Sequence, residues 1–105
     1  MIRLKRGVSI ASLQPQMLVA LQVADAVYEK RGLDAIVTSG DEGAHGSGSL
    51  HFVGLAVDLR TRTLEPGDRG NVRFELSEAL GEGFDVVLEG DHIHLEYQPK
   101  KGANQ

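Results

Sequence analysis

Histidine and aspartate side chains stand at spacings that could bind a metal ion. His51 and Asp58 lie seven residues apart in the run SLHFVGLAVD. His92 and His94 alternate in the run DHIHLEY. The chain contains no cysteine, so a metal ion would be held by imidazole and carboxylate groups alone. Zinc in a catalytic site takes about three such ligands and keeps one position open. His51, Asp58 and one of the paired histidines could supply that set, and the chemistry would be hydrolysis by activated water.

The residues around these side chains predict strands. In LAVDLRT the apolar side chains share one face, because side chains alternate along a strand, and Asp58 points to the other face. In DHIHLEY the same alternation places His92, His94 and Glu96 on one face. The candidate ligands would therefore project from the polar side of a sheet.

A glycine-rich loop precedes the first of these strands. Residues 39–49, SGDEGAHGSGS, have a composition that cannot pack into a core and that is typical of a surface loop. This loop contains His45. Gly54 would allow the backbone to bend tightly between the loop and the strand.

Two segments have the apolar spacing of helices. Residues 15–31, PQMLVALQVADAVYEKR, repeat apolar groups along one helix face, with Pro15 suited to the first turn. A second helix is expected from an N-terminal cap at Asn71 to a stop at Gly81 or Gly83.

The order of elements predicts the fold class. Residues 33–40 form a strand, and residues 84–97 form two short strands joined at the turn EGD. The predicted fold is α+β, with a small, mainly antiparallel sheet and helices packed on one face. Residues 1–105 form a single domain, in which 1–10 and 98–105 are expected to be flexible ends.

Composition narrows the classes of partner. The chain carries a net charge of -4, is 41% apolar and is 25% charged, which is ordinary for a globular protein and gives no basic field for nucleic acid. The longest apolar stretch, around residues 17–27, is interrupted by Gln22 and Asp25, so no membrane span is expected. The N-terminus has no signal-peptide pattern, and synthesis in the cytoplasm is expected.

The two histidine-containing runs together resemble a known family. SLHFVGLAVD followed by DHIHLEY is similar to the paired signature of the zinc D-Ala-D-Ala metallopeptidases. These include D,D-carboxypeptidases, D,D-dipeptidases and phage L-alanyl-D-glutamate endolysins, and their fold also occurs in the hedgehog signalling domain. The similarity runs from about Thr38 to Tyr97. It implies a hedgehog/DD-peptidase fold and hydrolysis of peptide bonds in peptidoglycan stem peptides, by an enzyme that could be phage-encoded and act on the cell wall.

The resemblance also implies roles for single residues. His51, Asp58 and His94 match the family's ligands for one zinc ion. His92 matches the histidine beside the site, where it could stabilise the oxyanion of a tetrahedral intermediate. His45 matches a loop histidine near the metal in the hedgehog branch.

Two carboxylates compete for the role of general base. Asp91, three residues before His94, matches the family's base. In a regular strand, however, Asp91 would face away from His92 and His94, so it reaches the site only if the chain is still turning there. Glu89 is the alternative base.

The chain departs from the family pattern at one position. Family carboxypeptidases commonly carry an arginine just after the TSG strand end, where it can pair with the terminal carboxylate of the substrate. Asp41 stands there in this chain. Arg60, Arg62 or Arg73 could replace the missing arginine, and an endopeptidase is the alternative to a carboxypeptidase.

Other classes of function fit the same residues. One alternative is a zinc-binding module of the same fold without catalysis, as in the hedgehog branch. Another is a structural component of a larger assembly, such as a phage particle, in which the histidine and aspartate cluster is vestigial.

Overall fold

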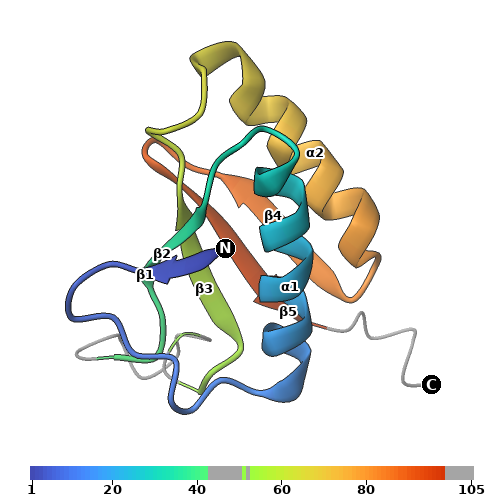
Figure 1. Ribbon diagram of the computed structural model, residues 1–105. Helices are drawn as coiled ribbons and strands as arrows, with labels where there is room; N and C mark the ends of the chain where they lie inside the picture. Colours follow the sequence, from blue (N-terminus) through green and yellow to red (C-terminus); the bar gives the residue numbers. More distant parts are fainter. Residues whose placement is uncertain (43–50, 52, 99–105) are drawn as a thin grey trace.

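Five strands form a single sheet. The structure is a computed structural model that describes residues 1–42, 51 and 53–98. The strands are β1 (Ile2–Leu4), β2 (Ala35–Ser39), β3 (Ala56–Arg60), β4 (Phe84–Leu88) and β5 (His92–Tyr97). They are arranged in the order β1-β2-β3-β5-β4 (Figure 1). Among these described strands, β1 and β2 are parallel and the other neighbours are antiparallel. The predicted α+β class and mainly antiparallel sheet are confirmed.

Strand β1 has no counterpart among the elements predicted from sequence. It pairs with β2 so that Ile2 lies opposite Ala35 and Leu4 opposite Val37. The helix α1 (Pro15–Glu29) provides the crossover that two parallel strands require. Strand β1 lies within residues 1–10, where a flexible end is expected from sequence. Its three residues are too few to show the alternation that identifies a strand.

Both helices cover the same face of the sheet. Helix α2 (Arg69–Leu80) packs against α1 and β4. Side chains from both helices join one face of the sheet in a single buried cluster, which includes Met17, Leu21, Tyr28, Val37, Val57, Leu59, Val72, Leu76, Ile93 and Leu95. The predicted placement of the helices on one face is confirmed. Neither helix has the length and apolar composition needed to cross a membrane.

The start of α2 differs from the sequence prediction. The helix begins at Arg69, after a 3₁₀ turn at Pro66–Asp68, so Asn71 lies inside the first turn and is not the N-terminal cap. The Asn71 amide instead donates a hydrogen bond to Asp68, at 3.2 Å. Asp68 is also bonded to Arg31, and this long-range contact could not be anticipated from local spacing. The predicted stop at Gly81 is confirmed, with φ at 84°.

The sheet face opposite the helices is polar. In the register of β3 and β5, Asp58 lies opposite His94 and Arg60 lies opposite His92. Val57 and Leu59 alternate with these residues and are fully buried on the helix side. The alternation predicted from sequence is therefore present, and it presents acidic, basic and imidazole groups together on one surface.

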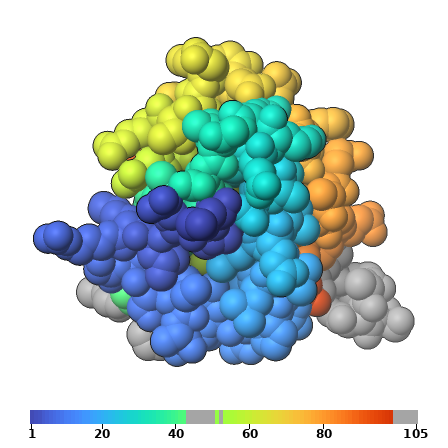
Figure 2. Space-filling model, in the orientation of Figure 1, coloured from blue at the N-terminus to red at the C-terminus, as the bar shows by residue number. Residues whose placement is uncertain are grey.

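The segment between β1 and α1 ties together the two loops that border this face. Asp41 accepts a hydrogen bond from the Ser12 backbone N–H at 2.6 Å. The Gln14 backbone N–H donates to the Gly54 carbonyl at 2.9 Å. Figure 2 shows the N-terminal segment, in blue, packed against the molecule beside α1. Residues 5–14, which we call the N-terminal strap, therefore connect the end of β2 to the start of β3.

Candidate metal centre

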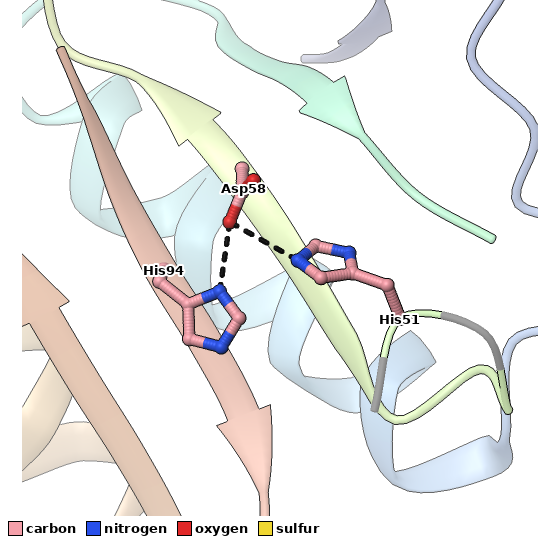
Figure 3. A group of neighbouring side chains, drawn as sticks. All are labelled: His51, Asp58 and His94. Carbon is pink, nitrogen blue, oxygen red and sulfur yellow. Dashed lines mark hydrogen bonds and ion pairs between the residues drawn. The ribbon is translucent and has the colours of Figure 1, made fainter. Parts of the chain in front are cut away.

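Three side chains from distant parts of the chain converge on the polar face. His51 precedes β3, Asp58 lies within β3 and His94 lies within β5. One potential ligand atom from each residue lies within 4.8 Å of the other two. Figure 3 shows both imidazole rings directed at the Asp58 carboxylate. The three residues predicted as metal ligands are thus adjacent, and the group could hold a metal ion. We call these three residues the metal centre.

The distances within the metal centre suit a small cation. Asp58 Oδ1 lies 2.8 Å from His94 Nδ1 and 3.3 Å from His51 Nε2. Ligand atoms of a tetrahedral zinc site lie about 3.4 Å apart, because each is about 2.1 Å from the metal. The donor atoms of the metal centre could therefore bind such an ion after small side-chain movements.

Each imidazole of the metal centre is anchored through its outer nitrogen. His51 Nδ1 lies 3.1 Å from the Gly40 carbonyl oxygen, and His94 Nε2 lies 2.7 Å from Glu96 Oε1. Carbonyl and carboxylate oxygens accept hydrogen bonds, so these outer nitrogens carry protons. The inner nitrogens, His51 Nε2 and His94 Nδ1, face Asp58, and each can bind a cation once it carries no proton. This is the arrangement of metal-ligating histidines, whose other N–H is held by a carbonyl or carboxylate.

The surroundings of the metal centre stabilise positive charge. Burial opposes ionisation of Asp58, but hydrogen bonds from His51 and His94 hold its pKa far below the usual range. The hydrogen bond to Asp58 raises the pKa of His94 to about 9, against the effect of burial, and Glu96 adds to the rise. Without a metal ion, His94 thus carries a proton between two carboxylates. A divalent cation would replace the proton at Nδ1.

Close backbone packing positions His51. The Gly54 N–H donates to the His51 carbonyl at 3.1 Å, and Gly54 has φ at 77°, so the predicted tight bend is confirmed. A Cβ atom at Gly54 would lie 2.2 Å from the Ser12 carbonyl oxygen. A Cβ atom at Gly40 would lie 2.1 Å from the Ser9 carbonyl oxygen. Both turns beside the metal centre are therefore restricted to glycine.

The remaining predicted site residues lie at the β4–β5 turn, with one exception. His92 Nε2 lies 3.8 Å from Asp58 Oδ1, and His92 Nδ1 is bonded to Asp91 Oδ1 at 2.6 Å. This bond lowers the pKa of Asp91, whose side chain is 93% exposed. Glu89 is exposed on the turn, and its backbone N–H donates to the His92 carbonyl. His45 lies outside the residues that the structure describes.

Asp41, at the position where an arginine is expected from the family pattern, makes a structural contact instead. Asp41 accepts the Ser12 N–H and thereby holds the N-terminal strap. Of the three arginines considered as replacements, Arg60 and Arg62 lie in a pocket next to the metal centre. Arg73 lies in α2, which packs on the opposite face of the sheet.

Sequence analysis missed two groups that support the metal centre. Glu96 was expected on the same face as His94, but no role was assigned to it. Its spacing of two residues on one strand was a usable signal, since neighbours on a strand face lie close together. The Gly40 carbonyl had no such signal, because a backbone oxygen is brought to His51 only by the tertiary fold.

A scan against protein-family models and a search of curated proteins found no match to this chain.

Proposed function

We propose that this chain is a zinc-dependent peptidase that hydrolyses peptide bonds in the stem peptides of bacterial peptidoglycan. His51, Asp58 and His94 would hold one Zn²⁺. The proposal rests on the resemblance of SLHFVGLAVD and DHIHLEY to the zinc D-Ala-D-Ala metallopeptidases. A five-stranded sheet with both helices on one face is compatible with the hedgehog/DD-peptidase fold of that family.

The observation that carries the proposal is the orientation of the two imidazoles. Gly40 and Glu96 hold the outer nitrogens, so the inner nitrogens of His51 and His94 face Asp58. A purely structural ion pair with Asp58 would not require two imidazole rings, each with its outer nitrogen bonded to an oxygen. Two imidazoles and one carboxylate are a ligand set that zinc accepts, and that is found in catalytic zinc sites.

The side chains beside the metal centre can move a proton. Bound zinc would supply a Lewis acid that makes water nucleophilic near neutral pH. Asp91 accepts a hydrogen bond from His92 Nδ1 and directs His92 Nε2 toward Asp58. In our proposal the Asp91–His92 pair takes the proton of the attacking water and returns it to the leaving amine. In our proposal Glu89 has no part in this step, since in the described part of the chain its backbone N–H, and not its carboxylate, is bonded to His92.

Metal content and peptide release, measured together, test the proposal. Elemental analysis after dialysis against trace zinc should find one zinc per wild-type chain and almost none in His51→Ala. Wild-type protein should release peptides from peptidoglycan. Asp91→Asn should retain zinc and lose about 100-fold in turnover, because it removes the acceptor that orients His92. The matched variant Glu89→Gln should retain both properties.

Two results would contradict the proposal. A wild-type chain that holds no zinc would exclude the metal centre. Loss of turnover in Glu89→Gln, together with full turnover in Asp91→Asn, would show that Glu89 and not Asp91 is the base.

A zinc-binding module without catalysis is the second candidate. It is favoured by the exposure of Asp91, whose carboxylate is turned to His92 and is not directed at the metal centre. This candidate predicts one bound zinc and no peptide release, and the same pair of measurements therefore separates it from the peptidase.

A further inference from the structure

A polar pocket of about 370 Å³ adjoins the metal centre. Asp58, Asp91 and His92 form the side that it shares with the candidate catalytic groups. Its other lining residues carry positive charges or hydroxyl groups, and they are Lys5, Arg60, Arg62, Thr38 and Ser39. A substrate group bound in this pocket would therefore lie next to a peptide bond positioned at the metal centre.

The three cations of the pocket have no acidic partner in the described part of the chain. Lys5, Arg60 and Arg62 form no ion pair with any residue that the structure describes. The two carboxylates of the pocket are engaged elsewhere, since Asp58 faces the histidines and Asp91 is bonded to His92. The arginine and lysine charges are thus available to an external anion.

The residues that carry these cations come from different elements of the fold. Arg60 ends β3, opposite His92, and its carbonyl accepts the Tyr28 hydroxyl at 2.8 Å from the helix side. Lys5 follows β1, and its N–H donates to the Val37 carbonyl at 2.9 Å. The pocket therefore combines Lys5, which follows β1, with Arg60 at the end of β3. The pairing of the strands in the sheet brings the two residues to the same pocket.

We propose that this pocket binds a carboxylate group of the substrate, through Arg60 and Arg62 with Lys5 as a further cation. The proposal rests on the proposed function, because it places the carboxylate on the residue next to the bond to be cleaved. Arginine recognises carboxylates through paired, charge-assisted hydrogen bonds, and it keeps its charge at all relevant pH values. Thr38 and Ser39 complete the polar lining, and their hydroxyls donate to the Asp58 carbonyl and to Glu42.

The proposal narrows the class of substrate. Peptides with a free carboxylate close to the scissile bond would bind, and peptides in which that carboxylate is amidated would bind poorly. The carboxylate could come from a chain terminus or from an acidic side chain, because both present the same two oxygens. The pocket thus supplies the anion recognition for which Asp41, bonded to Ser12, is unsuited.

Matched acid and amide peptides test the proposal with the full chain and one equivalent of Zn²⁺. One pair is acetyl-D-Ala-D-Ala and its carboxamide, which vary the chain terminus. The other pair is acetyl-L-Ala-D-Glu carboxamide and its D-Gln counterpart, which vary a side chain. Dissociation constants from NMR titration give a readout that needs no turnover, and kcat/KM is measured for any peptide that is cleaved. In at least one pair the acid should be preferred by about tenfold or more.

Single variants assign the preference to the pocket. Arg60→Gln and Arg62→Gln should each reduce the acid-over-amide preference by about threefold or more. Arg62 is exposed, so its replacement does not depend on the packing of β3. Arg73→Gln makes the same charge change on α2, outside the pocket, and should leave the preference intact.

The outcomes separate this proposal from the proposed function. Equal recognition of acid and amide in both pairs, or an equal loss for both members in the arginine variants, would overturn the carboxylate pocket. Cleavage without acid preference would overturn the pocket and leave the peptidase intact. An arginine-dependent acid preference in binding, without cleavage, would support the pocket and count against the peptidase.

Discussion

Two clusters of ionisable side chains, on opposite sides of the sheet, differ in how their carboxylates are neutralised. In the arginine cluster, Arg31 donates to Asp68 and through two nitrogens to Glu75, at 2.6 and 3.1 Å. Its guanidinium also donates to the Val27 carbonyl at 3.2 Å. A permanent cation thus meets two carboxylates in a fork geometry. The arginine cluster, defined as Arg31, Asp68 and Glu75, needs nothing from outside the chain.

The metal centre lacks such a permanent cation. Its inner nitrogens from His51 and His94 face a single oxygen of Asp58, and in the described part of the chain the side chains bonded to this oxygen are imidazoles, of which His94 has a pKa raised to about 9. Protons on imidazole exchange readily with metal ions, whereas a guanidinium does not lose its charge. The arginine cluster thus joins the end of α1 to α2, whereas the metal centre could hold a metal ion.

The largest effect is expected for Asp58→Asn. The amide keeps the shape of the side chain but removes the charge and one of the three ligands, so zinc affinity should fall by about 100-fold or more. Titration calorimetry with Zn²⁺ measures the change. Arg31→Met is the control from the arginine cluster and should bind zinc like the wild type. Loss of zinc from both variants would show that the two clusters are not independent.

Gly54→Ala should destabilise the whole chain by about 2–4 kcal/mol. The methyl group would be forced into a left-handed backbone conformation and would lie 2.2 Å from the Ser12 carbonyl oxygen. Urea denaturation measures the free energy of unfolding. Gly67→Ala is a suitable control, because a Cβ atom there has no neighbour within 4 Å. A Gly54→Ala variant as stable as the control would contradict the proposed role of the strap.

Glu96→Gln should weaken zinc binding by about 10- to 100-fold, because Glu96 holds the outer nitrogen of His94 and fixes its tautomer. The protein should remain as stable as the wild type, and zinc titration measures the affinity. Asp85→Asn serves as the matched variant. Asp85 lies opposite Glu96 in β4, but in the described part of the chain it makes no hydrogen bond or ion pair with His94. Equal affinity in the two variants would remove Glu96 from the metal centre.

The smallest effect is expected for the pH dependence of the arginine cluster. The hydrogen bond from Arg31 lowers the pKa of Glu75 from 4.5 to about 2. The Glu75 carboxylate therefore binds a proton more readily in the unfolded chain than in the folded one. The stabilisation is therefore complete above about pH 4.5 and is lost as the pH falls through about 2. Arg31→Met should be less stable than wild type by about 1–2 kcal/mol near pH 6. Denaturation at about pH 6 and about pH 3 should show the gap narrowing; a constant gap would contradict this account.

Alternation along strands accounts for what could be predicted of the site. It placed Asp58 opposite the apolar face and placed His92, His94 and Glu96 on a common face, and the structure has both arrangements. These predictions succeeded because side chains in a strand alternate wherever one face is buried. The helix beginning at Pro15 was predicted for a similar local reason.

Contacts between distant segments account for what could not be predicted. Strand β1 is stabilised by pairing with β2, and Asp68, which precedes α2, is bonded to Arg31. Likewise the Gly40 carbonyl meets His51, and Lys5 meets Arg60 in one pocket, only in the folded chain. None of these pairs has a spacing that local periodicity could reveal.

The amino-acid sequence by itself determined the two helices, the alternating strands and the chemical types of the candidate ligands, because these depend on short-range periodicity and on side-chain chemistry. The tertiary structure alone decided which nitrogens face Asp58, which carboxylates are already neutralised and which cations remain available. Those properties depend on contacts between different elements of the fold, such as the contact between Asp58 and His94, which lie 36 positions apart in sequence, and such contacts are set by the packing of the sheet.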